Sequence, residues 1–78
     1  STFINPDKKK AWKLIKESGC TNMSVGGAKI SNKHCNFLVN TGTATSKDLE
    51  SLGNKIKNKV YKQTGIKLNW EIKRIGSK

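Results

Sequence analysis

The stretch TSKDLESLGNKIKNKVYKQTG, residues 45–65, carries the clearest structural signal in this 78-residue chain. Thr45 and Asp48 have the spacing of a capping box, in which each side chain accepts a hydrogen bond from the other residue's backbone amide. The apolar residues that follow recur at helical spacing, at Leu49, Leu52, Ile56 and Val60. We therefore expect a helix over residues 46–63, ended by Gly65.

The residues after this helix alternate between apolar and polar side chains. The apolar set is Ile66, Leu68, Trp70 and Ile72, and the polar set between them is Lys67, Asn69, Glu71 and Lys73. Strict alternation is typical of a strand with one buried face. We therefore expect a strand over residues 66–72, with Glu71 pointing away from the core.

Residues 23–39 predict two or three further short strands. Apolar residues alternate on both sides of Gly26-Gly27, and residues 36–39, NFLV, form a compact apolar run. The glycine pair predicts a tight turn or bulge. A phosphate-binding loop would need spaced glycines with a Lys and a Ser or Thr.

The N-terminal part predicts a helix over residues 8–18, with Asp7 as a possible cap and Gly19 as the stop. Its apolar face would consist of Ala11, Trp12, Leu14 and Ile15. The expected fold is a single small α+β domain. In it, two helices pack on one small mixed or antiparallel sheet built from strands within residues 23–39 and 66–72.

The net charge of +11 would ordinarily indicate nucleic acid or an anionic membrane as the partner. However, Arg74 is the one arginine among 16 basic residues, and the lysines are spread along the chain. Base readout and bidentate phosphate capture rely on the guanidinium group. A solvated basic surface is therefore the favoured interpretation, and a small basic nucleic-acid-binding module is the alternative.

No apolar run is long enough to cross a membrane, and no signal core follows the N-terminal charges, so we expect a cytoplasmic protein. Cys20 and Cys35 are too far apart for a CxxC motif, and His34 cannot complete a metal site. We expect two free thiols and no metal. A Cys35–His34 catalytic dyad is disfavoured because adjacent residues of an extended segment point to opposite faces.

Four segments together resemble the MurB reductases. Residues 1–6, STFINP, resemble the family's SxFxNP, and residues 26–40, GGAKISNKHCNFLVN, resemble its GGAxVSxKHANFxxN. Residues 41–45, TGTAT, continue this stretch, and residues 65–76, GIKLNWEIKRIG, are similar to GxxLxxEVRxIG. The resemblance covers essentially the whole chain. Two departures are Cys35, where the family usually has Ala, and Trp12, where it often has a small residue.

The resemblance implies that residues 1–78 are the C-terminal, substrate-binding domain of a UDP-N-acetylenolpyruvylglucosamine reductase, a bacterial enzyme of peptidoglycan synthesis. In this family NADPH reduces FAD, and hydride then passes to UDP-N-acetylglucosamine enolpyruvate. The FAD-binding region that precedes this domain in the family is absent from the sequence. We therefore expect an inactive fragment that binds neither FAD nor NADPH by itself and relies on the missing flavin domain.

The resemblance also assigns roles to three residues. Ser1 matches the serine that donates a proton, Glu71 matches the carboxylic residue that helps stabilise or protonate the intermediate, and Asn5 matches a residue that contacts the substrate's diphosphate. Without the resemblance, Glu71 would be a solvated carboxylate among lysines, and Ser1 a cloning remnant. Arg74 does not take the role of the family's flavin-domain arginine. Ser1 and Glu71 lie at opposite ends of the chain, so the roles require the fold to bring the segment over residues 1–5 beside the terminal strand.

Overall fold

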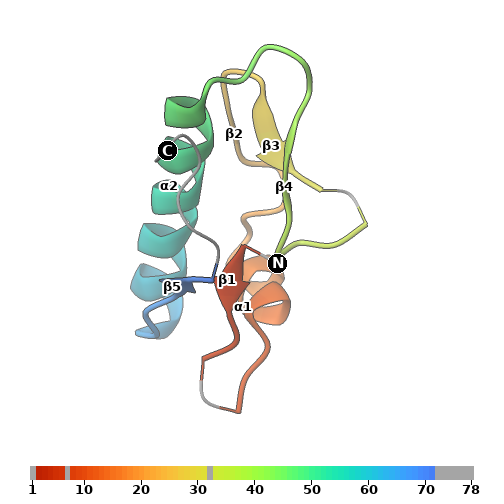
Figure 1. Ribbon diagram of the computed structural model, residues 1–78. Helices are drawn as coiled ribbons and strands as arrows, with labels where there is room; N and C mark the ends of the chain where they lie inside the picture. Colours follow the sequence, from red (N-terminus) through yellow and green to blue (C-terminus); the bar gives the residue numbers. More distant parts are fainter. Residues whose placement is uncertain (1, 7, 32, 72–78) are drawn as a thin grey trace.

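The computed structural model describes residues 2–6, 8–31 and 33–71. Along these residues the chain forms, in order, β1 (Phe3–Ile4), α1 (Ala11–Glu17), β2 (Ser24–Val25), β3 (Ala28–Ile30), β4 (Leu38–Asn40), α2 (Ser46–Thr64) and β5 (Asn69–Trp70). The strands make two antiparallel sheets, β2–β3–β4 and β1–β5 (Figure 1). The expected α+β class, with two helices and short strands between residues 23 and 40, is confirmed.

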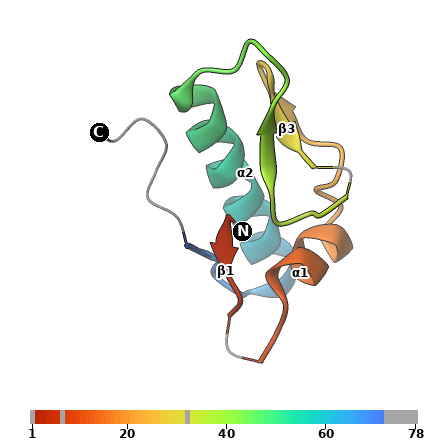
Figure 2. The same cartoon turned by 45° about the vertical axis from the view of Figure 1, so that its right-hand side comes forward.

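The long helix α2 organises the domain. Its N-terminal half runs beside the three-stranded sheet, and its C-terminal half lies near the β1–β5 pair (Figures 1 and 2). The buried face of α2 carries Leu52, Ile56 and Val60, which are fully covered. Burying each large aliphatic side chain is worth about 1.5–3 kcal/mol. The remaining buried apolar residues are Phe3, Ala11, Leu14, Ile15, Cys20, Ala28, Ile30 and Leu68.

Both ends of α2 follow the local chemistry of the sequence. The Thr45 hydroxyl accepts a hydrogen bond from the Asp48 amide at 3.0 Å, and the Asp48 carboxylate accepts one from the Thr45 amide at 3.1 Å. Gly65 ends the helix with a φ of 75°, a conformation that favours glycine. The expected helix is confirmed and extends one residue further, to Thr64.

The first helix differs from the prediction in two respects. It begins at Ala11 and not at Lys8, and Asp7, the expected cap, lies outside the described residues. The amide of Ala11 donates to the Asn5 side-chain oxygen at 2.8 Å. Trp12 is 40% exposed, because Ala11, Leu14 and Ile15 form the buried stripe and Trp12 lies on the neighbouring one.

The sheet arrangement also differs from the prediction. The C-terminal strand was expected to join the strands of residues 23–39 and to span residues 66–72. Instead β5 covers only Asn69–Trp70 and pairs with β1, and residue 72 lies outside the described part. Aromatic contact favours this pairing, because Phe3 lies opposite Trp70 and the ring centroids are 5.1 Å apart.

Candidate functional site

The β1–β5 pair brings residues 2–4 beside residues 69–71. The amide of Glu71 donates to the carbonyl of Thr2 at 2.9 Å, directly beyond the Phe3–Trp70 pair. The expectation that the N-terminal segment lies beside the terminal strand therefore holds for Thr2 to Ile4. The Glu71 side chain is exposed, as the alternation of the sequence predicted. Ser1, which precedes Thr2, lies outside the described residues.

The position of Glu71 depends on the preceding residue, Trp70. The indole ring packs on α2 over Gly53, so closely that a Cβ at this position would overlap the ring. Lys57 of the same helix places its ammonium group 5.8 Å from the indole centroid. Because Trp70 also contacts Phe3, one aromatic side chain ties β5 to both β1 and α2. The backbone that carries Glu71 is thereby anchored to the core.

Asn36 joins the same cluster from a different part of the chain. Its side chain is 3% exposed; its Oδ1 accepts from the Phe3 amide and its Nδ2 donates to the Phe3 carbonyl, both at 2.8 Å. The sequence interpretation placed residues 36–39 together as an apolar run and did not single out Asn36. In the structure the burial at two of these positions is the opposite of what their polarity suggests: the apolar Phe37 is 44% exposed, whereas the polar Asn36 is buried.

Asn5, the candidate contact for the substrate's diphosphate, is exposed at the end of β1. Its side-chain oxygen accepts the hydrogen bond from Ala11 that opens α1. Within the described part of the chain, the Asn5 Nδ2 group makes no hydrogen bond. This nitrogen is a neutral donor of the kind that suits a phosphate oxygen, and the contact with α1 fixes the side chain that carries it.

The glycine pair builds a turn and not a phosphate cradle. Gly26 and Gly27 link β2 to β3, and a Cβ on Gly26 would overlap the Asp48 carboxylate. A Cβ on Gly27 would overlap the Thr43–Ala44 segment. The expected tight turn is confirmed, and close approach to the loop that caps α2 explains why both positions lack side chains.

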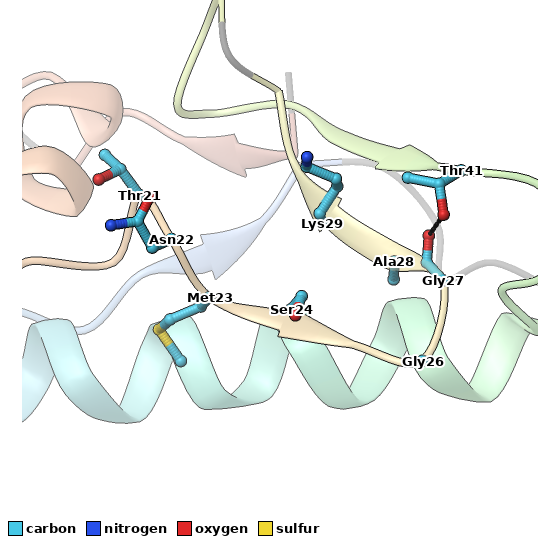
Figure 3. A pocket seen from close by; sticks show the side chains of 9 residues that line it. All are labelled: Thr21, Asn22, Met23, Ser24, Gly26, Gly27, Ala28, Lys29 and Thr41. Atoms are coloured by element: carbon cyan, nitrogen blue, oxygen red, sulfur yellow. Dashed lines mark hydrogen bonds between the residues drawn. The ribbon is translucent and has the colours of Figure 1, made fainter.

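The hairpin carries a shallow hollow of about 260 Å³ on one side (Figure 3). Figure 3 shows Lys29 pointing away from α2 and Ala28 pointing toward it. Thr41 closes one end of the hollow by donating its hydroxyl hydrogen to the Gly27 carbonyl at 2.8 Å. Glycines that are packed against protein cannot wrap a cofactor diphosphate.

The cysteines and His34 show no catalytic arrangement. Cys20 and Cys35 are free thiols, as expected, the first buried and the second half-buried. His34 accepts the Asn36 amide on Nδ1 at 3.2 Å, and its ring meets Phe37 edge-on, so this nitrogen is unavailable to a thiol. Among the described residues no group of three or more His, Cys, Asp or Glu side chains is placed to hold a metal ion. No helix in that same part is long and apolar enough to cross a membrane.

Fold and site define a small α+β domain in which residues 2–4 pair with residues 69–71, with the Glu71 side chain exposed at this junction. Comparison with known families then identifies it. The chain belongs to the family described as the C-terminal domain of UDP-N-acetylenolpyruvoylglucosamine reductase, whose sequence profile matches residues 1–75.

Individual relatives agree with this membership. The chain is 57% identical over 76 residues to the UDP-N-acetylenolpyruvoylglucosamine reductase of Rickettsia prowazekii, covering 97% of the chain and 26% of the relative. It is 58% identical over 78 residues to the reductase of Gluconobacter oxydans, covering 100% of the chain and 26% of the relative. For the reductase of Granulibacter bethesdensis the identity is 59% over 76 residues, 97% of the chain and 25% of the relative. The chain thus spans about a quarter of the length of these relatives.

Proposed function

We propose that this chain is the substrate-binding and proton-donating domain of an FAD-dependent reductase. The enzyme converts UDP-N-acetylglucosamine enolpyruvate into UDP-N-acetylmuramate with NADPH, in peptidoglycan synthesis in the bacterial cytoplasm. Family membership supports the reaction class. The observation that carries the assignment of this domain is the Thr2–Glu71 hydrogen bond, because it joins the two segments that hold the candidate catalytic residues.

Three residues divide the work in this proposal. Asn5 donates its amide hydrogens to the diphosphate, which orients the substrate. Ser1 delivers a proton to the enolpyruvyl carbon next to the carboxylate, and Glu71 stabilises or protonates the intermediate. When bound in the complete enzyme, FAD supplies the hydride. Because a serine hydroxyl is a weak acid in water, most of the rate enhancement must come from positioning and from a charge-stabilising surrounding.

The proposed partner of this domain is the flavin-binding part of the same polypeptide. The relatives are about four times as long as the chain, and the Gly26-Gly27 pair is packed against protein. The 78-residue chain alone therefore binds no FAD and oxidises no NADPH. Purified chain with a yellow colour and flavin absorbance that survives desalting would contradict this part of the proposal.

A nucleic-acid-binding module is the competing class, and the position of Trp70 argues against it. Modules that bind single-stranded nucleic acid stack bases on aromatic side chains of an open sheet. Trp70 instead packs against Phe3 and over Gly53 of α2. The basic surface remains available for weak contacts with polyanions.

The test uses the full-length polypeptide that carries this chain. We expect the purified protein to retain FAD and to oxidise NADPH over many turnovers only when UDP-N-acetylglucosamine enolpyruvate is present. The control is the same polypeptide with residues 1–78 deleted, which should keep its flavin but lose turnover of the enolpyruvyl substrate. Substrate-dependent NADPH oxidation by the deleted protein would overturn the proposed role of this domain.

A further inference from the structure

Asn36 is bonded to the segment that follows Ser1 through three hydrogen bonds. Its carboxamide accepts from the Phe3 amide and donates to the Phe3 carbonyl, each at 2.8 Å. Its backbone carbonyl accepts from the Thr2 amide at 2.6 Å. Asn36 is separated from Phe3 by 33 residues of sequence and is 3% exposed. Because both hydrogen bonds of this buried carboxamide go to Phe3, its burial is compensated at β1 alone.

The geometry of β1 explains why this contact is needed. In an antiparallel pair, successive residues direct their backbone groups alternately toward the partner strand and away from it. The Thr2 carbonyl accepts from the amide of Glu71, the residue after β5, whereas both backbone groups of Phe3 and the Thr2 amide bond to Asn36 on the opposite edge. Phe3 is 1% exposed, so water cannot satisfy these groups. The Asn36 carboxamide therefore acts as a one-residue strand on the second edge of β1.

The loop that carries Asn36 is itself held in place. The Asn36 amide donates to His34 Nδ1 at 3.2 Å, and the Ser31 amide donates to the Phe37 carbonyl at 2.8 Å. This loop connects β3 to β4, so its position is set by the larger sheet. Asn36 thus links the β2–β3–β4 sheet to the two-residue strand β1 of the other sheet, so the position of β1 depends on that of the larger sheet.

We propose that Asn36 is a positioning residue: its hydrogen bonds hold Thr2 and Phe3, the two residues after Ser1 in the sequence, beside β5 and the Glu71 that follows it. The inference rests on the proposed function, because it gives Asn36 an effect on catalysis through Ser1. Without the carboxamide, both backbone groups of Phe3 would lose their partner, and β1 would be less firmly held relative to Glu71.

The test is a double-mutant cycle in the full-length reductase, with the two half-reactions measured separately by stopped flow. Asn36→Ala should slow flavin oxidation by the enolpyruvyl substrate about ten-fold or more, since small misplacements of reacting groups have effects of this size. Flavin reduction by NADPH should stay at the wild-type rate, and the substrate's KM should change less than kcat. In a Ser1→Ala background, Asn36→Ala should add less than about two-fold, because residues that act as one unit are not additive.

Two further variants separate positioning from general instability. Ile30→Val removes a buried methyl group in β3 and serves as the destabilised control, with both half-reactions expected near the wild-type rate. If Asn36→Ala does not retain flavin, Asn36→Asp is measured instead. Asp keeps an acceptor for the Phe3 amide but loses the donor to its carbonyl, so it should show the same slow step. Failure of both Asn36 variants to fold would assign Asn36 a structural role alone and overturn the inference.

The outcomes also distinguish this inference from the function beneath it. Wild-type flavin oxidation in Ser1→Ala would overturn the role of Ser1 itself. If Ser1→Ala is slow, Asn36→Ala at the wild-type rate overturns only the positioning role. The positioning role is also overturned if the fold-losses in the rate of flavin oxidation caused by Ser1→Ala and Asn36→Ala multiply in the double variant.

Discussion

Thr2 and Glu71 face each other across the end of the β1–β5 pair, where the Glu71 amide donates to the Thr2 carbonyl at 2.9 Å. The register of this pair is fixed by the neighbouring Phe3–Trp70 contact. A slip by one residue would turn Glu71 toward the opposite face, because side chains alternate along a strand. The exposed position of the Glu71 side chain therefore depends on how Trp70 packs against the core.

Replacing Thr45 should measure the value of the α2 capping box. Thr45→Ala removes the hydroxyl that accepts the Asp48 amide, so the free energy of unfolding should fall by about 1 kcal/mol. Urea denaturation of the 78-residue chain gives this value. Ser46→Ala, one residue into the helix and exposed, is the control and should change stability by less than about 0.5 kcal/mol. Equal losses in the two variants would contradict the capping role.

Gly53→Ala should destabilise the domain, although Ala is usually the better helix residue by about 1 kcal/mol. The new methyl group would overlap the Trp70 ring, so β5 or the helix would have to move, at a cost of about 1–3 kcal/mol. Asn54→Ala at the next, exposed position of α2 should instead be neutral or stabilising. If Gly53→Ala raised the midpoint of urea unfolding, the close packing of Trp70 on α2 would be wrong.

The two cysteines should differ in reactivity. Burial raises the pKa of the Cys20 thiol, against a smaller opposing effect of Lys59, so the reactive thiolate of Cys20 forms only at higher pH than that of an ordinary thiol. Iodoacetamide at neutral pH should therefore label half-buried Cys35 first, with mass spectrometry reporting each site. Labelling of Cys20 should increase as the pH rises or the chain unfolds. Equal labelling rates in the folded chain at neutral pH would contradict the burial of Cys20.

The basic surface should bind polyanions weakly and without sequence preference. Lys8, Lys9, Lys10 and Lys13 surround a hollow of about 280 Å³ next to α1. Contacts with phosphates release counterions, so fluorescence-anisotropy titrations with DNA should show affinity that falls steeply with salt. A variant with Gln at positions 8–10 should bind more weakly for all sequences alike. Sub-micromolar, sequence-selective RNA binding at physiological salt would instead favour the nucleic-acid-binding class.

The features that sequence reasoning predicted correctly are those with local causes. Thr45, Asp48 and Gly65 set the ends of α2 through contacts within a few residues, and Gly26, with a φ of 56°, provides the backbone conformation of the β2–β3 turn. The pairing of Phe3 with Trp70 joins residues at opposite ends of the chain, and two-residue strands are too short for alternation to reveal. The prediction therefore assigned the C-terminal strand to the wrong sheet.

The candidate site was predictable only in part, for the same reason. The resemblance supplied Ser1, Asn5 and Glu71, and the alternation of residues 66–72 supplied the outward direction of Glu71. Asn36 could not be found in this way, because an asparagine before an apolar run gives no sign of which strand its carboxamide meets. Its bonds to Phe3 appear only when the β3–β4 loop and β1 are folded together.

The catalytic roles of Ser1 and Glu71 are tested most directly by one rate constant. The full-length enzyme is first reduced with NADPH and then mixed with UDP-N-acetylglucosamine enolpyruvate in a stopped-flow spectrometer, which follows the return of oxidised-flavin absorbance. Ser1→Ala and Glu71→Gln should each slow this step by about 100-fold or more, the size expected for loss of a proton donor, while flavin reduction by NADPH stays nearly unchanged. Wild-type flavin oxidation in either variant would contradict the role proposed for that residue.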